Sequence, residues 1–164
     1  MPRRPAGGRR CPSRRPDRHR GAFRAAGGRD RPVRRRGSVR ALYAELELAG
    51  SDRVRDAWAA TLATPGRTVL VAEAAGEIVG TVDLTVLANA AHAGDPYLLV
   101  ENVVIDAAHR RSGVGAALLA AARDHGRRAG CYKLQLSADE PEAFAFYESL
   151  GLRPLARTYK EYLA

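Results

Sequence analysis

The chain has 164 residues, a net charge of +9, 46% apolar residues and two cysteines. This length fits one domain with a real core, and two cysteines without CxxC spacing exclude a disulfide framework and argue against a structural zinc site. No apolar run approaches the roughly 18 residues of a membrane span, and no secretory signal is evident. We therefore expect a cytoplasmic protein that makes no membrane contact.

The excess positive charge lies entirely in the first 40 residues. They hold 15 Arg and 2 Asp, a net charge of +13, whereas residues 41–164 hold 12 basic and 16 acidic side chains, a net charge of −4. Residues 1–37 are rich in Arg, Pro, Gly and Ala, so they bury too little apolar surface to offset the entropy of ordering, and we expect disorder. Two interpretations stay open: an arm for nucleic acid or another acidic partner, or a spurious leader from a GC-rich gene.

From Ser38 the pattern becomes that of a folded α/β domain spanning 38–164. Apolar spacing predicts a helix capped by Ser38 and three more helices, over 51–62, 114–129 and 141–150. Apolar runs predict four strands, over 68–73, 78–87, 97–106 and 132–137. The third strand is apolar enough to be buried on both faces. The last segment, 152–163, is expected to be extended.

The segment after the third predicted strand carries the chemistry. There Arg110-Arg111-Ser112-Gly113-Val114-Gly115 leads straight into a helix. Backbone N–H groups at a helix N-terminus lack acceptors and the dipole adds positive charge, so with two Arg the turn suits a diphosphate. We expect Gly113 and Gly115 to let phosphate oxygens approach the backbone. Neither a P-loop nor a Rossmann fingerprint fits, because the former needs Lys-Ser/Thr and the latter a third glycine, where Leu118 stands.

Three motifs in order resemble those of the GNAT superfamily of N-acetyltransferases. They are Glu101–Asp106, Arg110-x-x-Gly113-x-Gly115 and Ala143-x-x-Phe146-Tyr147-x-x-x-Gly151. The match covers about residues 40–164. It implies the GNAT fold, a twisted mixed β-sheet flanked by helices, in which the two central strands, 97–106 and 132–137, are splayed apart around acetyl-CoA. The string Gly130-Cys131-Tyr132-Lys133 also resembles the glucosamine-6-phosphate acetyltransferase branch, although it is too common among relatives to name a substrate.

The resemblance also implies roles for residues. The pantetheine arm of acetyl-CoA pairs with the backbone of Val103, Val104 and Ile105, like an added strand. The coenzyme contacts of the turn come from Arg110, Arg111, Ser112, Gly113, Val114, Gly115 and Ala116. Tyr147 matches the family tyrosine that acts as general acid towards the CoA thiolate; the alternative is that it only packs and hydrogen-bonds the sulfur. No cluster of histidines and acids suggests a metal.

Glu101 is the candidate general base. Strand alternation places Leu99, Glu101, Val103 and Ile105 on one face, where we expect a desolvated carboxylate. Two other interpretations stay open: Glu101 binds the substrate amine, or it faces solvent at a strand end.

The sequence departs from the family pattern at two places. The family opens with a strand before its first helix, but residues 31–37 contain Pro32 and three consecutive Arg, a poor strand. We therefore expect the first strand to be degenerate or missing. Glu140 stands where many relatives have an Asn that bonds the pantetheine arm, and it offers a helix cap instead.

Together these observations predict an enzyme, an acyl-CoA N-acyltransferase that moves the acetyl group from acetyl-CoA to a primary amine of a small molecule or protein by direct attack in a ternary complex. The acceptor cleft is expected between the helices at 39–63 and the loop at 88–96, near Glu45, Glu47, Asp52, His92 and Asp95. Two alternatives stay open: a nucleic-acid- or ribosome-associated protein acting through the Arg-rich tail, and a non-catalytic CoA-binding domain. The acceptor and homodimer formation are not decided by the sequence.

Overall fold

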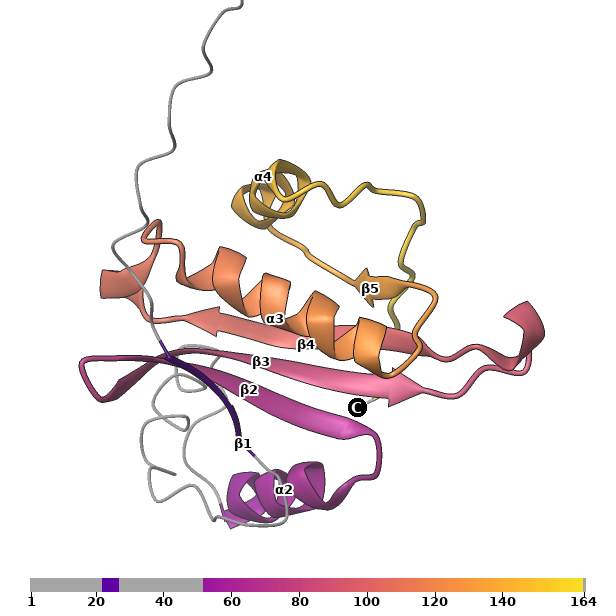
Figure 1. Cartoon of the computed structure of the whole chain (residues 1–164), viewed down its shortest axis with the longest axis horizontal. Coiled ribbons are helices and arrows are strands. Elements are labelled where there is room, and N and C mark those ends of the chain that lie inside the picture. The colour runs from indigo at the N-terminus through magenta and orange to yellow at the C-terminus, as the bar shows by residue number, and fades with distance from the viewer. Residues whose placement is uncertain (1–21, 27–51, 164) are drawn as a thin grey trace, which may run out of the picture.

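A computed structural model describes residues 22–26 and 52–163, so the helix predicted after Ser38 lies outside the described residues. Five strands form one sheet in the order β1-β2-β3-β4-β5 (Figure 1). The strands are β1 Ala22–Ala26, β2 Arg67–Ala74, β3 Glu77–Leu87, β4 Tyr97–Ile105 and β5 Leu134–Leu136. Neighbours are antiparallel except for the parallel pair β4 and β5. The sheet is therefore mixed, as predicted.

The first strand is present, which corrects the prediction that it is degenerate or missing. β1 pairs antiparallel with β2 along its whole length and lies upstream of the Arg-rich stretch 31–37. Apart from Ala22–Ala26, the segment 1–37 lies outside the described residues, so its disorder stays a prediction. The physical reason is that the outer edge of β2 offers backbone hydrogen-bond partners to any short segment that can extend, whatever its composition.

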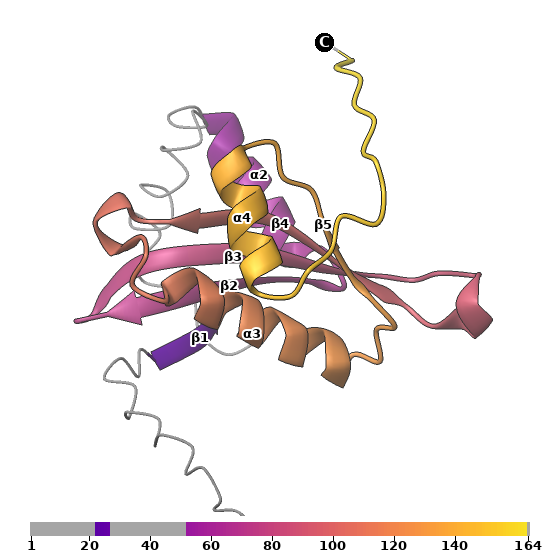
Figure 2. The ribbon, with the colours of Figure 1, turned by 90° about the horizontal axis from the view of Figure 1, so that it is seen from above.

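Helices cover both faces of the sheet (Figure 1). α2, Asp52–Ala63, lies on one face and α3, Val114–Arg128, on the other. α4, Pro141–Ser149, lies beside the first half of α3 (Figure 2). Two short 3-10 turns, η1 His92–Gly94 and η2 Ala107–His109, precede and follow β4. Within 52–163, the predicted helices and strands are confirmed with shifts of one or two residues, while 152–163 forms neither helix nor strand.

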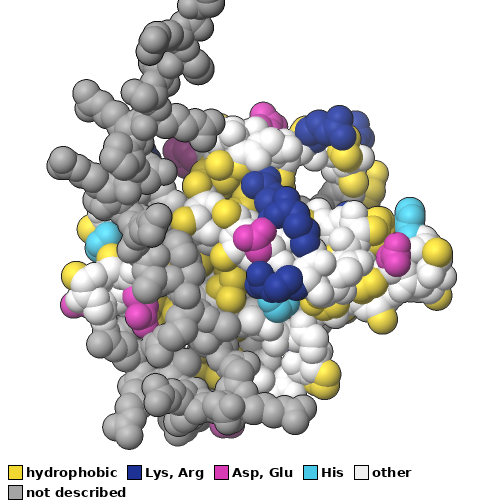
Figure 3. All heavy atoms as spheres, viewed as in Figure 1, with side chains coloured by type: hydrophobic (Ala, Val, Ile, Leu, Met, Phe, Trp, Pro, Cys, Tyr) yellow, Lys and Arg dark blue, Asp and Glu magenta, His cyan; other side chains and the backbone are white. Residues whose placement is uncertain are grey.

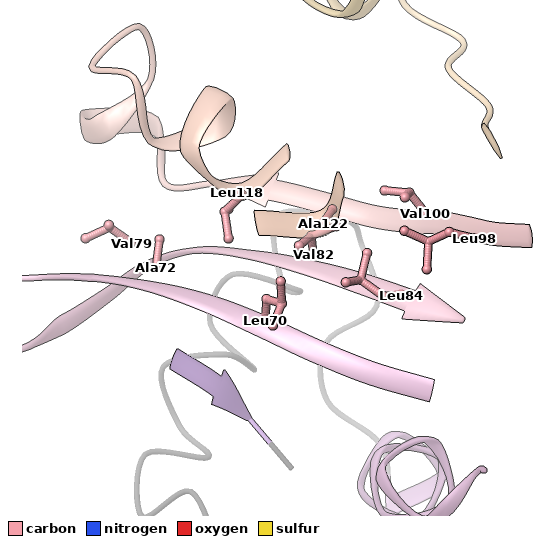
Figure 4. Packing of buried hydrophobic residues seen from close by; sticks show 9 residues of the cluster. All are labelled: Leu70, Ala72, Val79, Val82, Leu84, Leu98, Val100, Leu118 and Ala122. Atoms are coloured by element: carbon pink, nitrogen blue, oxygen red, sulfur yellow. The ribbon is translucent and has the colours of Figure 1, made fainter. Parts of the chain in front are cut away.

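The core lies in two layers, one on each side of the sheet. Under α3, buried side chains of three strands meet Leu118 and Ala122 of the helix (Figure 4). On the other face Val69, Val71, Ile78 and Val104 form a second cluster, against which Trp58 and Leu62 of α2 pack. The apolar stripes of both helices, spaced at three and four residues, thus find their partners on opposite faces of one sheet.

Basic side chains gather over α3 on the face shown in Figure 3. The last turn of α3 carries His125, Arg127 and Arg128. Cations there compensate the partial negative charge of the helix C-terminus. Burial, and secondarily the charge of Arg128, lowers the pKa of His125. These basic residues lie at the C-terminal end of α3, so they are distant from the turn that precedes its N-terminus.

Candidate functional site

β4 and β5 run side by side for only three residues. The pairing begins at Leu98 with Leu134 and ends at Val100 with Leu136, where β5 stops. β4 continues to Ile105, so its edge beyond Val100 has no partner strand among the described residues (Figure 1). This confirms the predicted splay between the two strands. An unpaired backbone edge of this kind accepts an extended ligand as an added strand.

A β-bulge lies at the point where the two strands part. Two residues of β4, Asn102 and Val103, oppose a single residue of β3, Val82. Asn102 has a left-handed backbone, with φ +50°, which Asn tolerates better than most residues. Because a bulge bends its strand and increases the local twist, it accounts for the departure of β4 from β5.

The bulge overturns the predicted alternation along β4. Leu98 and Val100, before the bulge, belong to the cluster under α3, and Val103 and Ile105, after it, pack against the same cluster. An extra residue exchanges the two faces for everything beyond it, because side chains alternate with a period of two. Glu101 therefore does not share a face with Val103 and Ile105, as predicted, but points to the side of α2.

The prediction that Glu101 is desolvated is also wrong, because its side chain is exposed. Its direct neighbour across the ladder is Asp83 of β3, which is only 2% exposed. Glu101 stands at the first position after the β4–β5 pairing ends. The carboxylate is therefore accessible to a molecule that approaches the parted strands from the α2 side, and its role as a base stays a prediction.

Asp106 holds the turn that follows β4. Its Oδ1 accepts hydrogen bonds from the Ala108 N–H at 2.9 Å and from His109 Nδ1 at 3.0 Å. The hydrogen bond from His109 holds the pKa of Asp106 below its ordinary value of 3.8. The Ser112 hydroxyl donates to the His109 carbonyl. Our sequence analysis missed Asp106, although an Asp directly after a strand commonly closes such a turn.

The backbone amides of the turn form a candidate anion site. Gly113 caps α3 in the left-handed conformation, φ +93°, and Arg111 has φ +60°. The Ala117 N–H donates to the Gly113 carbonyl at 3.0 Å, whereas the amides before Ala117 precede the helical hydrogen bonds. Both Arg side chains are exposed, and Arg110 Nε donates to the Ile105 carbonyl at 3.2 Å. Amides at a helix N-terminus beside two guanidinium groups suit a phosphate or diphosphate.

The two glycines of the turn have different roles. A Cβ on Gly113 would meet no protein atom within 4 Å, so within the protein it is the left-handed backbone that favours glycine here. A Cβ on Gly115 would lie 2.9 Å from Phe146 Cζ. Gly115 therefore makes room for α4, a role that the sequence did not predict, and its contact with phosphate stays a prediction.

The contact of Phe146 with Gly115 brings α4, the helix that carries Tyr147, close to the turn. Tyr147 follows Phe146, and their ring centroids are 5.0 Å apart. At the end of α4, Arg123 Nη2 donates to the Leu150 carbonyl at 2.7 Å, which ties α4 to α3. Burial raises the pKa of Tyr147 above its ordinary value of 10.0, so the phenol keeps its proton at neutral pH. Tyr147 is thus a protonated hydroxyl on the helix that packs against the anion site.

Other candidate residues stand apart from this arrangement. Glu140 is the N-cap residue of α4, as predicted, although its side chain makes no cap hydrogen bond. His92 stacks on Tyr132, with centroids 4.2 Å apart, in the loop at the opposite end of β4 from the turn (Figure 1). Glu45, Glu47 and the Asp52 side chain lie outside the described residues.

In the part of the chain that the structure describes, no group of three His, Cys, Asp or Glu could hold a metal ion. No helix there has the length and apolar content of a membrane span. The cytoplasmic location stays a prediction.

Comparison with known proteins places this geometry among acetyltransferases. A family model described as the acetyltransferase (GNAT) family matches residues 38–152. A curated glucosamine 6-phosphate N-acetyltransferase from Trypanosoma brucei brucei is 36% identical over 78 residues, which are 48% of this chain and 52% of that protein. The chain thus matches about half the length of this curated relative.

Two solved structures are similar over most of the chain. A putative acetyltransferase from Agrobacterium tumefaciens str. C58 has a TM-score of 0.76 and 31% identity, covering 86% of this chain and 99% of that one. The aminoglycoside N-acetyltransferase AAC(6')-Iy in complex with CoA has a TM-score of 0.69 and 17% identity, covering 87% and 99%. The second likeness shows the fold alone.

Proposed function

Because the chain belongs to the acetyltransferase (GNAT) family, we propose that it transfers the acetyl group of acetyl-CoA to a primary amine of a small molecule. The observation that carries the proposal is the unpaired edge of β4 beyond Val100, which leads directly into the amide turn before α3. One ligand with a polar extended arm and a diphosphate fits both features at once.

The coenzyme site combines backbone and charge. The pantetheine arm pairs with the backbone of Val103, Val104 and Ile105, and the diphosphate lies on the amides of the turn. The cofactor-binding residues of this turn are Arg110, Arg111, Ser112, Gly113, Val114, Gly115 and Ala116. Positive φ angles at Arg111 and Gly113 support this role, because such backbone turns direct successive N–H groups to one side.

The chemistry is direct attack in a ternary complex. The amine nitrogen bonds to the thioester carbonyl carbon, the carbon–sulfur bond breaks, and the electron pair leaves on sulfur. Tyr147 gives its proton to the departing thiolate, and Glu101 takes the proton that the amine loses, directly or through water. Burial raises the pKa of Tyr147, so the phenol holds its proton at neutral pH, which the acid role requires. The exposed position of Glu101 where the strands part supports contact with the amine.

Two observations favour a small-molecule acceptor. The similar proteins include a glucosamine 6-phosphate N-acetyltransferase and an aminoglycoside N-acetyltransferase, whose names identify amino sugars as their substrates. The Glu101 carboxylate suits the cationic form that such amines have at neutral pH. An amino sugar is therefore the first acceptor class to test, with a peptide N-terminus as the comparison.

The test is a CoA-thiol release assay with the full chain and acetyl-CoA, across glucosamine 6-phosphate, an aminoglycoside and a short peptide. We expect release that depends on the amino sugar, with the acetylated product seen by mass spectrometry. Glu101→Gln should lower kcat. Glu142→Gln, at an exposed position in the first turn of α4, is the matched control. Absence of acetyl transfer to all three amines, with CoA binding intact, would favour the non-catalytic alternative.

A further inference from the structure

The sheet holds one buried acid next to the coenzyme strand. Among the described residues, Asp83 is the charged side chain that the core encloses, at 2% exposed. Arg67 of β2 pairs with it: Arg67 Nε donates to Oδ1 at 3.0 Å, and Nη2 donates to Oδ2. A buried carboxylate without such partners would be very costly, so the ion pair is what allows Asp83 to occupy the middle of the sheet.

The same carboxylate also reaches the bulge of β4. Asn102 Nδ2 donates a long hydrogen bond, 3.4 Å, to Asp83 Oδ2. Asn102 is the residue with φ +50° whose left-handed backbone creates the bulge. Arg67, Asp83 and Asn102 thus form a chain of contacts across three strands, which we call the bulge clamp.

The bulge clamp lies where β4 separates from β5 and where its unpaired edge begins. Beyond the bulge the strand has left β5, and those backbone groups from Val103 onward that do not pair with β3 face the unpaired edge. The orientation of those groups depends on the backbone dihedral angles of Asn102. The hydrogen bond from the Asn102 side chain to Asp83 restrains these angles, because it fixes the residue to the neighbouring strand. A shift of a fraction of an ångström at a positioned donor weakens its contact with a ligand.

We propose that Asp83 is a positioning residue: through the Asn102 amide it fixes the bulge of β4, and with it the backbone that receives the thioester end of the coenzyme. This inference rests on the proposed function only for the identity of the ligand, because the clamp itself is a contact within the sheet. Arg67 pairs with the Asp83 carboxylate through hydrogen bonds from Nε and Nη2 and holds its orientation. Asp83 does not touch the reacting atoms.

Exchanging the two side chains tests the clamp. Asn102→Asp keeps the size of the side chain, and Asp also tolerates the left-handed backbone. The substitution replaces the amide donor by a second carboxylate that faces Asp83. Asp83→Asn removes the negative charge of the carboxylate that accepts the hydrogen bond from the Asn102 amide. In the double variant the roles are reversed, so that the amide at 83 donates to the carboxylate at 102. Asp124→Asn, which breaks the exposed pair of Asp124 with Arg127 on α3, is the control.

The readouts are the Kd of CoA from calorimetry, amide exchange at 102–104, and urea unfolding. We expect each single variant to weaken CoA binding about tenfold, as for loss of a charge-assisted hydrogen bond, and to speed exchange at 102–104. The double variant should recover most of both, whereas the control should change neither. If the single variants acted only by lowering overall stability, the double variant would be at least as unstable as either one. Recovery of both CoA affinity and slow amide exchange in the double variant therefore indicates the specific contact between positions 83 and 102.

The proposal is overturned if Asn102→Asp binds CoA as wild type does, or if the double variant is no better than the worse single variant. Should Asp83→Asn fail to fold, Asn102→Gly takes its place, since glycine keeps the left-handed backbone and removes only the amide; wild-type affinity in this variant also overturns the clamp. If the wild-type chain binds no CoA, the proposed function fails, while exchange at 102–104 still decides whether the clamp holds the bulge.

Discussion

Gly80 is the position where one added methyl group should disturb both the core and the turn. Gly80 lies in β3 opposite Ile105, under the start of α3. A Cβ there would be 2.9 Å from Ile105 Cδ1, 3.0 Å from Val114 Cγ1 and 3.1 Å from Leu118 Cδ1. Leu118 is 0% exposed, so the close-packed side chains around the new methyl group have little room to withdraw.

The magnitude of the Gly80→Ala effect follows from two opposing contributions. Overpacking of a filled core costs about 1–3 kcal/mol, and the lower chain entropy of Ala relative to Gly in a strand returns roughly 0.5–1 kcal/mol. We therefore expect a net destabilisation of about 1–2 kcal/mol. Because Val114 is the first residue of α3, affinity for CoA should fall as well.

Urea unfolding followed by circular dichroism measures this effect, and a double-mutant cycle assigns it. Ile105→Val removes the atom at 2.9 Å and by itself costs about 0.5–1.5 kcal/mol. Combined with Gly80→Ala it should cost clearly less than the sum of the two single variants, since the methyl groups no longer collide. Additive costs would show that the Ile105 contact does not limit the site.

The same substitution at Gly126 is the control. Its Cβ would meet one side-chain atom closer than 3.4 Å, Leu98 Cδ2 at 3.1 Å, and Ala is favoured over Gly in a helix by about 1 kcal/mol. We expect Gly126→Ala to be close to neutral. If Gly80→Ala is as stable as wild type, with an unchanged m-value, the space above Gly80 is not closed and the reasoning is refuted.

Two further predictions concern the turn and α4. Tyr147→Phe should lower kcat by about 10²–10⁴, as expected for loss of a general acid, with the Kd of CoA unchanged. Since burial raises the pKa of Tyr147 above 10.0, its neutral form stabilises the fold below that pH and this contribution is lost as pH rises further; unfolding of Tyr147→Phe should show a smaller loss at high pH. Asp106→Ala should raise the Kd of CoA several-fold because Ala108 and His109 lose their acceptor, whereas Asp106→Asn, which keeps an oxygen, should stay close to wild type. The pKa of Asp106 is lowered, so its contribution to stability is complete above pH 3.8 and disappears as pH falls through the lowered value.

The order and type of the elements in 52–163 could be predicted because their signals are local. Apolar periodicity predicted α2, β2, β3, β4, α3 and α4 within one or two residues, and Gly113 before an apolar helix predicted the turn at the start of α3. The motif that contains Tyr147 likewise lies within one helix. These features depend on neighbours along the chain, and the sequence displays such neighbours directly.

Other features could be seen only in the tertiary structure, because they depend on contacts between residues that are distant in the sequence. Alternation along β4 predicted Glu101 on the same face as Val103, but the bulge at Asn102 exchanged the faces; an Asn inside an apolar strand was the available signal. Gly115 is small because Phe146, thirty-one positions later in the sequence, packs on it. Asp83 is buried because Arg67 of the adjacent strand satisfies its carboxylate. In each case a residue's role is set by a partner that only the folded sheet brings within reach, since backbone register and side-chain packing are properties of neighbouring strands and helices rather than of one segment.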